Sequence, residues 1–433
     1  MTLRRIVKRI LAGVLFLLGL AASVVMSLVL AYRVAKWMPQ IAGLVAVALL
    51  VFFLGVLLTT LLVGRVLPTF LSRRALLSSA VWTAVFAFGL YLAAFRPIHY
   101  PHYTPVPRAN TQYWNLSTGS HIAYSVYDPP AGMPVKPEPI VFVHGGPGFR
   151  AFDTDHAFYS QFTQDGFRVY LFDQAGSGLS GQFAQGSNYT VERFVADLEA
   201  IREQIGAERL ILIGHSWGGT LIAHYAAAYP DHVANLVFHS PGGIWDWKSA
   251  PFEDQRTARV KMALPPTRIM AAIMLSHVSV VATANLVPQD EFGDWIMTVN
   301  DPGELVCEGE RSKLLIGFTP VNLAGMNAYP LLVAGRELND PKMDVRSQLG
   351  RVHAPAIMLT SQCDFVPWTE QSQYKQSIPG LHNYYFTESG HFINFSQPEK
   401  LTVLIRSFFS INHHRFLRMR ATPTHVLQSN HDG

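Results

Sequence analysis

The first 127 residues contain no aspartate or glutamate, although the whole chain of 433 residues carries 30 of these acids. Of its 34 lysines and arginines, 11 precede Asp128, which leaves 23 basic against 30 acidic residues in the remainder. The overall net charge of +4 therefore describes neither part of the chain. Because the early basic residues flank long apolar runs and form no patch, nucleic acid is excluded as a partner.

Cysteine is also scarce, since Cys307 and Cys363 are the only two. Two cysteines cannot build a framework of several disulfides. A single disulfide and two free thiols both remain open. His99 and His102 lie in a proline-rich segment and are interpreted as solvated rather than metal-binding. We expect no metal ion and no cofactor.

Charge is absent from three long apolar runs, which cover residues 10–32, 41–63 and 75–95. Each run is long enough to cross a bilayer as a helix. Three successive runs with basic residues between them argue against core helices. A cleaved signal peptide would have a shorter apolar stretch than the first run, and two more runs follow it. The sequence therefore predicts three transmembrane helices.

The orientation of these helices is predicted from the basic residues in their flanks. Such residues are concentrated before the first run and between the second and third, namely Arg4, Arg5, Lys8, Arg9, Arg65, Arg73 and Arg74. Only Arg33 and Lys36 lie in the first connection. We expect a cytoplasmic N-terminus and, after three crossings, an extracytoplasmic domain.

The stretch GHSWGGT places Ser216 after the aliphatic run LILIG and before an alanine-rich, helix-like run. A serine at a strand-to-helix turn with glycines two residues away on either side is typical of a nucleophile elbow. Such a turn has no room for a Cβ at the flanking positions, and Gly214 and Gly218 meet this steric requirement. The plainer alternative is a strand end followed by a helix cap.

Partners for Ser216 are expected in three other loops. The apolar strand PIVFV leads into HGGPG, whose Gly146 or Gly145 would supply one backbone N–H of an oxyanion hole, with Trp217 supplying the other. Asp364 and His391 follow two later apolar runs, in the chain order expected of an acid and a base. Because strands alternate with helices, we expect a parallel sheet whose carboxyl ends bring these loops together.

These motifs resemble the α/β-hydrolase superfamily, and within it the proline iminopeptidase group of serine peptidases. The likeness rests on HGGPG, DQAGSGLS, YTVERFVADLEAIREQIG and GHSWGGT, and it returns at CDFVP and SGHF. It implies a mostly parallel sheet with helices on both faces and a helical cap, here preceded by three transmembrane helices. It also places the nucleophile, acid and base on Ser216, Asp364 and His391. Ala175, which stands where the family commonly has arginine, departs from its pattern.

The predicted organisation divides the chain into six segments. They are a membrane domain (1–96), a proline-rich linker (97–111), the first part of the hydrolase core (112–243), a helical cap (244–351), the second part of the core (352–411) and a flexible tail (412–433). Within the cap, the apolar run 268–287 cannot be a fourth crossing, because that would separate Ser216 from His391 across the bilayer. It is interpreted as a buried or membrane-facing cap helix.

The predicted activity is that of a membrane-anchored serine hydrolase without a cofactor. The resemblance favours an aminopeptidase that releases N-terminal residues from peptides and holds the substrate amino group with acidic cap residues. Glu253 and Glu304 are chosen for this role among the candidates Asp246, Glu253, Glu304, Glu308 and Glu310. An esterase or lipase acting on apolar esters, and a non-catalytic membrane binding or scaffold protein, are the alternatives. The expected partners are a small peptide or ester substrate and the lipid bilayer.

Overall fold

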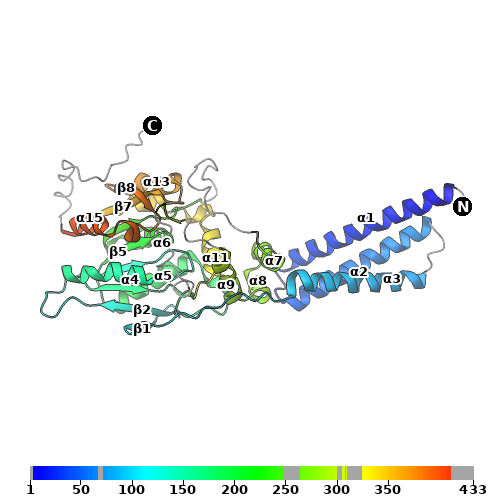
Figure 1. Cartoon of the computed structure of the whole chain (residues 1–433), viewed down its shortest axis with the longest axis horizontal. Coiled ribbons are helices and arrows are strands. Elements are labelled where there is room, and N and C mark those ends of the chain that lie inside the picture. Colours follow the sequence, from blue (N-terminus) through cyan, green and yellow to red (C-terminus); the bar gives the residue numbers. More distant parts are fainter. Residues whose placement is uncertain are drawn as a thin grey trace. The chain divides into compact units, whose positions relative to one another are not determined.

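The computed structural model describes residues 3–66, 72–246, 264–299, 305–307, 309 and 324–410. The chain divides into two compact units, and each is described by itself. The membrane-helix unit comprises Met1–His99 and Leu264–Pro288, and the hydrolase unit comprises Tyr100–Ala263 and Gln289–Gly433. Figure 1 shows both units, with many of their helices and strands labelled.

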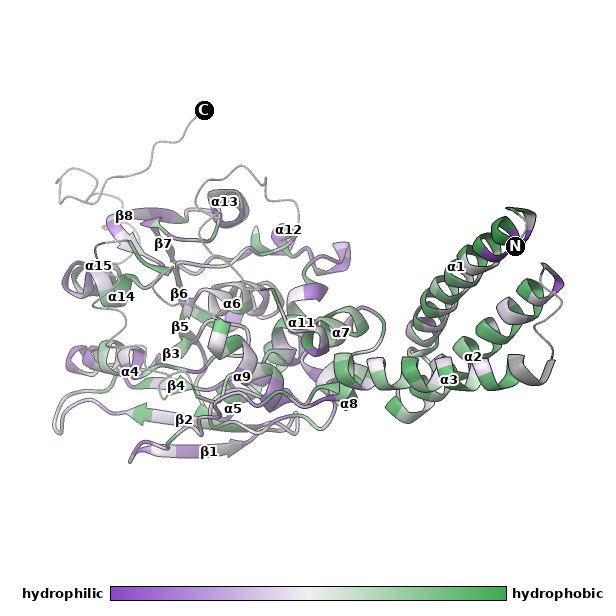
Figure 2. Ribbon diagram, turned by 45° about the vertical axis from the view of Figure 1, so that its right-hand side comes forward, coloured by the Kyte–Doolittle hydropathy of each residue, from purple (hydrophilic) through white to green (hydrophobic). Residues whose placement is uncertain are grey.

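Three long apolar helices begin the membrane-helix unit. They are α1 (Leu3–Val34), α2 (Ile41–Val66) and α3 (Ser72–Leu90), and a π-helical turn η1 (Tyr91–Phe95) extends α3. Apolar residues extend along all three helices in Figure 2. The candidate membrane spans Arg5–Val34, Ile41–Arg65 and Ala75–Phe95 agree with the three predicted runs. By length and composition, the unit can therefore cross a bilayer three times.

Small residues allow α1 and α2 to approach each other closely. A Cβ on Gly19 would lie 2.3 Å from Thr59 Cγ2, and one on Gly55 would lie 2.5 Å from Ser23 Oγ. Close backbone approach at glycine is how helices gain packing contacts where surrounding lipid removes the hydrophobic driving force.

Two short helices from the predicted cap segment also belong to the membrane-helix unit. They are α7 (Thr267–Ser276) and α8 (Val280–Leu286). A ten-residue helix is about 15 Å long and cannot cross a hydrocarbon core of about 30 Å. The apolar run 268–287 is thus a pair of short helices and not a fourth crossing.

An eight-stranded sheet forms the centre of the hydrolase unit. Its strands are β1 (Thr111–Asn115), β2 (His121–Tyr127), β3 (Ile140–Val143), β4 (Val169–Phe172), β5 (Leu210–His215), β6 (Val233–His239), β7 (Ala356–Cys363) and β8 (His382–Gly390). The spatial order is β1-β2-β4-β3-β5-β6-β7-β8. Only the pairs that involve β2 are antiparallel. The carboxyl ends of β3 to β8 therefore share one edge of the sheet.

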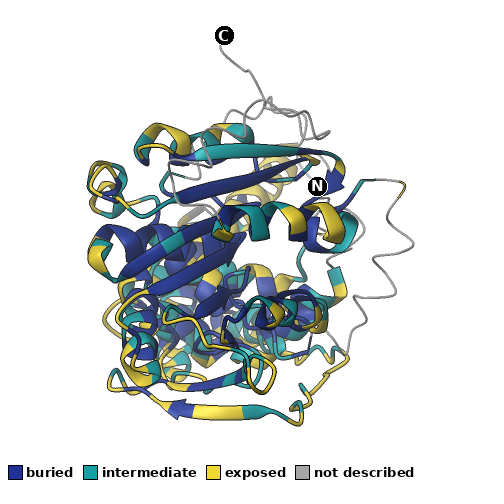
Figure 3. Cartoon of the chain, turned by 90° about the vertical axis from the view of Figure 1, so that its left-hand side faces the viewer, coloured by how far each residue is buried: buried dark blue, intermediate teal, exposed yellow. Residues whose placement is uncertain are grey.

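Helices of the hydrolase unit cover the sheet and contribute to its core. They include α4 (Asp153–Tyr159), α5 (Val191–Ile205), α6 (Trp217–Ala228), α13 (Trp368–Ser377), α14 (Ile393–Ser396) and α15 (Pro398–Ser410). Fully buried aliphatic residues of β3 and β5 pack in one cluster with residues from α4 and α15. Figure 3 shows buried residues along the central strands and exposed ones on β1 and the outer helix faces. Because the central strands are apolar on both faces, they form without alternation of polar residues.

The described part of the cap in the hydrolase unit consists of short helices. They are α9 (Gln289–Val299), α11 (Tyr329–Glu337), η8 (Pro341–Met343) and α12 (Arg346–Leu349). The side chain of His102, expected to be solvated, lies 3.0 Å from the Asp294 carboxylate of α9 and is still half exposed. The proline-rich segment is thus attached to the cap at this point. The predicted tail 412–433 lies outside the described residues.

Candidate active site

Ser216 lies between the end of β5 and the start of α6, in a backbone conformation that side chains rarely adopt. Its φ of 56° and ψ of −123° are those of a strained turn. The turn is held from both sides, since Ser216 N donates to His239 O at 3.0 Å and Ser216 O accepts from Gly242 N at 2.9 Å. The structure thus over-determines an unfavourable conformation, as a nucleophile elbow requires.

The two glycines that flank this serine are sterically necessary. A Cβ on Gly218 would lie 1.9 Å from Val143 O, and one on Gly214 would lie 2.4 Å from Gly218 O. Both obstacles are backbone atoms, which cannot move aside as a side chain could. Glycine at these positions therefore permits the close approach of β5, α6 and the end of β3.

Asp364 and His391 form a buried pair beyond the ends of β7 and β8. The distance between His391 Nδ1 and Asp364 Oδ1 is 2.7 Å, and both side chains are almost fully buried. Asp364 also accepts hydrogen bonds from Val366 N at 3.0 Å and from Gln371 Nε2 at 2.9 Å. These donors fix the carboxylate, so it can hold the imidazole with Nδ1 protonated and Nε2 able to accept a proton.

The residue before Ser216 links the serine loop to the histidine loop. The side chain of His215 donates from Nε2 to His391 O at 3.0 Å, and the two imidazole rings have centroids 4.7 Å apart. Burial lowers the pKa of His215 well below its usual value, with the nearby His391 as a further cause. His215 is therefore a neutral structural contact between the serine loop and the histidine loop.

The glycines of HGGPG lie directly against the serine. A Cβ on Gly145 would lie 2.9 Å from Ser216 Cβ, and Gly146 has a φ of 130° that favours glycine. The Gly146–Pro147 bond is cis. Trp217 is the first residue of α6 and is almost fully buried. The predicted oxyanion residues are thus adjacent to the predicted nucleophile.

Gln174, from DQAGSGLS, is a contact that the sequence reasoning missed. Its Oε1 accepts from Trp217 Nε1 at 2.9 Å, and its Nε2 donates to His144 O at 2.8 Å. The backbone N of Gln174 donates to His144 Nε2 at 2.8 Å. One side chain therefore fixes the HGGPG loop relative to the start of α6. Only its place inside a conspicuous glycine-rich motif could have indicated this.

Glu370, in the first turn of α13, is a second carboxyl group near Asp364 and was also missed. Burial raises the pKa of Glu370 to about 7, a hydrogen bond with the Gly243 backbone opposes this, and Asp364 raises it further. Gly243 follows the residue whose N–H bonds to Ser216 O. Glu370 thus carries a titratable charge beside the acid and the loop that supports the serine.

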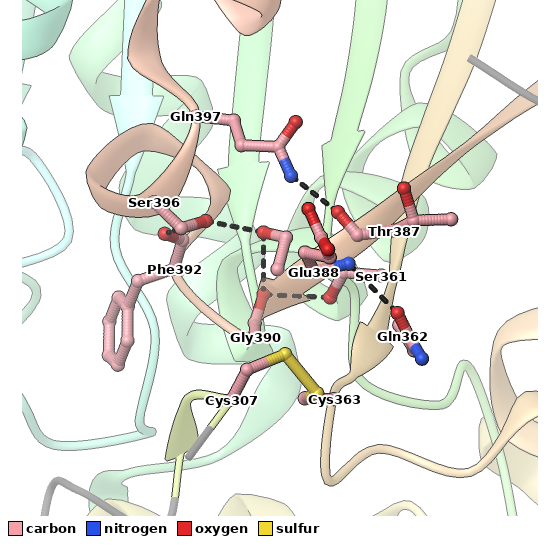
Figure 4. Close-up of a disulfide and its surroundings, with 11 residues drawn as sticks. Cys307, Ser361, Gln362, Cys363, Thr387, Glu388, Gly390, Phe392, Ser396 and Gln397 are labelled. Atoms are coloured by element: carbon pink, nitrogen blue, oxygen red, sulfur yellow. Dashed lines mark hydrogen bonds between the residues drawn. A yellow bond between two sulfur atoms is a disulfide. The ribbon is translucent and has the colours of Figure 1, made fainter. Parts of the chain in front are cut away.

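A disulfide joins a short cap segment to the loop of the catalytic candidates, as Figure 4 shows. Cys307 is bonded to Cys363, the residue that immediately precedes Asp364. Leu305, two residues before Cys307, accepts a hydrogen bond from His391 N at 2.8 Å. The segment therefore contacts the acid loop through its cysteine and the histidine loop through its backbone.

The predicted substrate-binding acids Glu253 and Glu304 lie outside the described residues, as do Glu308 and Glu310. Asp246 is the candidate that the structure describes, and it is partly buried, with its backbone N bonded to Leu338 O. Its φ of 55° is unusual for a residue other than glycine.

Comparison with known proteins agrees with this architecture. Residues 138–270 match the family model described as the alpha/beta hydrolase fold. The chain is 39% identical over 99 residues to the proline iminopeptidase of Neisseria gonorrhoeae. This match covers 23% of this chain and only 31% of that protein. The chain is also 23% identical over 297 residues to the proline iminopeptidase of Heyndrickxia coagulans, and this match covers 68% of this chain and 96% of that protein.

A solved esterase from Thermogutta terrifontis has the same fold. It aligns with a TM-score of 0.51 and 21% identity over 70% of this chain and 98% of its own. Together with the strand order, these matches confirm the predicted α/β-hydrolase fold. They also confirm the resemblance to proline iminopeptidases.

Proposed function

We propose that this protein, whose chain has the α/β-hydrolase fold, is a membrane-anchored serine hydrolase with Ser216, His391 and Asp364 as nucleophile, base and acid. The observation that carries the proposal is the strained turn at Ser216 beside the buried Asp364–His391 pair. A protein that only binds or scaffolds has no physical need to maintain both features. The N-terminal apolar helices would anchor the enzyme.

In the proposed reaction, Ser216 Oγ attacks the substrate carbonyl while His391 Nε2 accepts the hydroxyl proton. Asp364 holds the opposite ring nitrogen and stabilises the imidazolium that forms. The backbone N–H of Trp217 and that of Gly146 or Gly145 stabilise the developing oxyanion, a contribution of roughly 3 to 4 kcal/mol per donor in studied cases. The protonated His391 then delivers its proton to the leaving group, and water hydrolyses the acyl-enzyme by the reverse sequence.

The substrate proposed first is a peptide with a free N-terminus, from which one residue is released. It is supported by the 39% identity over 99 residues to a proline iminopeptidase. A substrate ammonium buried without a counter-charge would pay a large desolvation penalty, so this activity needs an acid in the cap.

The test compares prolyl and alanyl amides that carry a free amino group with their N-acetylated forms. We expect the purified full-length protein in detergent to cleave the free amines and to leave the acetylated ones. Asp246 and each of the other cap acids are then neutralised one at a time, as in Asp246→Asn. We expect one or two of these single variants to have a raised KM for the free-amine substrate. KM for a plain ester should stay unchanged in all of them. Equal cleavage of acetylated substrates would overturn the aminopeptidase proposal.

An esterase acting on apolar esters is the second candidate, and Ala175 favours it. This residue is 1% exposed and stands where the resembling peptidases commonly carry arginine. A buried alanine leaves no room for a long cationic side chain without rearrangement of the DQAGSGLS loop. If the protein hydrolyses a fatty-acyl chromogenic ester faster than every aminoacyl amide, the esterase becomes the favoured function in place of the aminopeptidase.

The catalytic domain is proposed to lie on the extracytoplasmic side. Basic residues concentrate before the first apolar helix and between the second and third. The Cys307–Cys363 disulfide supports the same assignment, because such bonds persist in oxidising compartments. Reporter fusions after Arg74 and after Arg108 should report opposite compartments. A cytoplasmic signal from both would contradict the proposed topology.

A further inference from the structure

The helix pair α7–α8 combines an apolar surface with a nearly complete lack of charge. Within Leu264–Pro288, Arg268 is the only lysine, arginine, aspartate or glutamate. Its side chain is 8% exposed. A pair of helices at a water-facing surface normally presents charged residues outward. This pair presents none.

The buried Arg268 attaches α7 to the end of the third apolar helix. Its Nη1 donates to Ala94 O at 2.6 Å and its Nη2 donates to Leu286 O at 2.7 Å. Thr267 Oγ1 donates to Ala93 O at 2.7 Å. Carbonyl groups in the last turn of a helix lack partners within the helix, and a guanidinium satisfies them well. The start of α7 is therefore fixed at the last turn of the third helix.

A second contact fixes α8 at the same end of the bundle. Asn285 Nδ2 donates to Pro39 O, which lies in the connection between α1 and α2, at 3.1 Å. Two aromatic side chains are exposed near these contacts, with Trp37 77% and Tyr91 50% exposed. Tryptophan and tyrosine are enriched where membrane spans meet water. Both anchors of the helix pair thus lie at the end of the candidate spans that carries these two aromatic residues.

The outward surface of α7 includes two large apolar side chains, beside Thr267 at its start. Met270 and Met274 lie one helical turn apart and are 38% and 58% exposed, and Leu264, just before the helix, is 90% exposed. We propose that α7 lies along the extracytoplasmic boundary of the bilayer with Met270 and Met274 in contact with lipid. A lipid surface is the partner because the helix is fixed to the end of a candidate span and exposes no charge.

This inference rests on the proposed membrane anchoring but not on the hydrolytic activity. The anchored helix pair gives the protein a membrane contact in addition to its three spans. Only Val287 and Pro288 separate α8 from α9 along the chain, and α9 belongs to the hydrolase unit. The cap is therefore joined covalently to a segment that contacts lipid.

The test places a fluorophore at single introduced cysteines of the full-length protein. The two native cysteines are bonded to each other and do not react with the label under non-reducing conditions. Met270→Cys and Met274→Cys are labelled with an environment-sensitive dye in vesicles of phosphatidylcholine and phosphatidylglycerol. Quenching is measured with lipids that carry a nitroxide near the headgroup and with aqueous iodide.

Two matched positions serve as controls. Leu58→Cys lies in α2 at a residue that is 60% exposed. Gln376→Cys lies at an exposed residue of α13 in the hydrolase unit. We expect the labels at 270 and 274 to be quenched by the nitroxide lipid, as at 58, and to be protected from iodide. The label at 376 should show the opposite pattern.

The controls separate two kinds of failure. If the labels at 270 and 274 are quenched by iodide as strongly as the label at 376, while the label at 58 is quenched by lipid, the proposed interfacial position of α7 is wrong. If the label at 58 is not quenched by the nitroxide lipid either, the membrane anchoring itself is wrong, and the inference that rests on it falls as well.

Discussion

Cys307 and Cys363 form a disulfide that fastens a cap segment beside the predicted catalytic acid. The same segment accepts a hydrogen bond from His391 N through Leu305 O. Gly390, which precedes His391, is so close to this segment that a Cβ there would lie 2.3 Å from Val306 Cα. The disulfide thus holds one short segment against both loops that carry the Asp364–His391 pair.

The first prediction is that breaking this disulfide lowers both stability and turnover. It closes a loop with a sequence separation of 56 residues, which corresponds to about 4 kcal/mol in the chain-entropy treatment. Because a small displacement of a catalytic group is costly, kcat of a Cys307→Ala/Cys363→Ala variant should fall by roughly ten- to a hundredfold while KM changes little. Thermal unfolding and steady-state kinetics measure the two effects.

A dithiol reductant should reproduce these changes in the wild type and have no effect on the double variant. If reduction lowers the unfolding temperature but kcat measured well below it stays constant, the disulfide stabilises the fold without positioning the pair.

The elements that carry the site were predictable because their signals are local. The strand preceding Ser216 and the glycines around it follow from a buried apolar run and a steric requirement. Asp364 and His391 could be selected because each follows an apolar strand in the expected chain order. The parallel sheet then determines that these loops share one edge.

Contacts between distant segments could not be predicted in the same way. The Cys307–Cys363 bond, the placement of α7 against the last turn of the third apolar helix and the links made by Gln174 all depend on three-dimensional packing. Hydrophobic periodicity shows which face of an element is buried but not what covers it. The apolar run 268–287 illustrates this, because its composition fits a cap helix and a membrane contact equally well.

The second prediction concerns the proposed nucleophile. Ser216→Ala and His391→Ala should each reduce kcat by several orders of magnitude, because the three groups act as a unit. Asp364→Asn should cost less, since the serine and the histidine remain. A fluorophosphonate probe should label the wild type and not Ser216→Ala. Labelling that persists in the variant would mean that another residue is the nucleophile, and activity absent from the wild type would favour a binding or scaffold role.

The third prediction uses the second carboxyl group beside Asp364. Because the pKa of Glu370 is about 7, this group becomes charged as the pH rises from 6 to 8. An added negative charge near Asp364 favours the imidazolium that forms during the reaction. Glu370→Gln should therefore lower kcat at pH 8 by up to roughly tenfold, equivalent to one pKa unit of coupling, and change it little at pH 6.

The control for this effect is Glu388→Gln, which removes an exposed carboxylate from β8 and should leave the pH profile unchanged. A constant ratio of wild-type to Glu370→Gln activity across pH 6 to 8 would show that the charge of Glu370 does not reach the proposed base.

The last prediction concerns stability and a buried acid in α4. Asp155 is 3% exposed, and burial raises its pKa to about 7 despite hydrogen bonds from Phe152 N and Asn394 Nδ2. The folded state thus binds a proton that the unfolded chain releases near pH 4. The stability that this group contributes is complete below about pH 4 and is lost as the pH rises to about 7.

Asp155→Asn cannot ionise, and its amide can donate to Asn394 Oδ1, which has no hydrogen-bond partner among the described residues. We expect the unfolding temperature in detergent to exceed that of the wild type by a small amount at pH 5 and by a larger amount at pH 8. A pKa shift of about three units sets an upper limit of roughly 4 kcal/mol on this gain. Asp165→Asn, which alters a partly exposed ion pair with Arg406, is the control and should show no such dependence. If the unfolding temperatures of Asp155→Asn and the wild type run parallel from pH 5 to pH 8, Asp155 is ionised in the folded protein throughout this range, and burial does not raise its pKa as described.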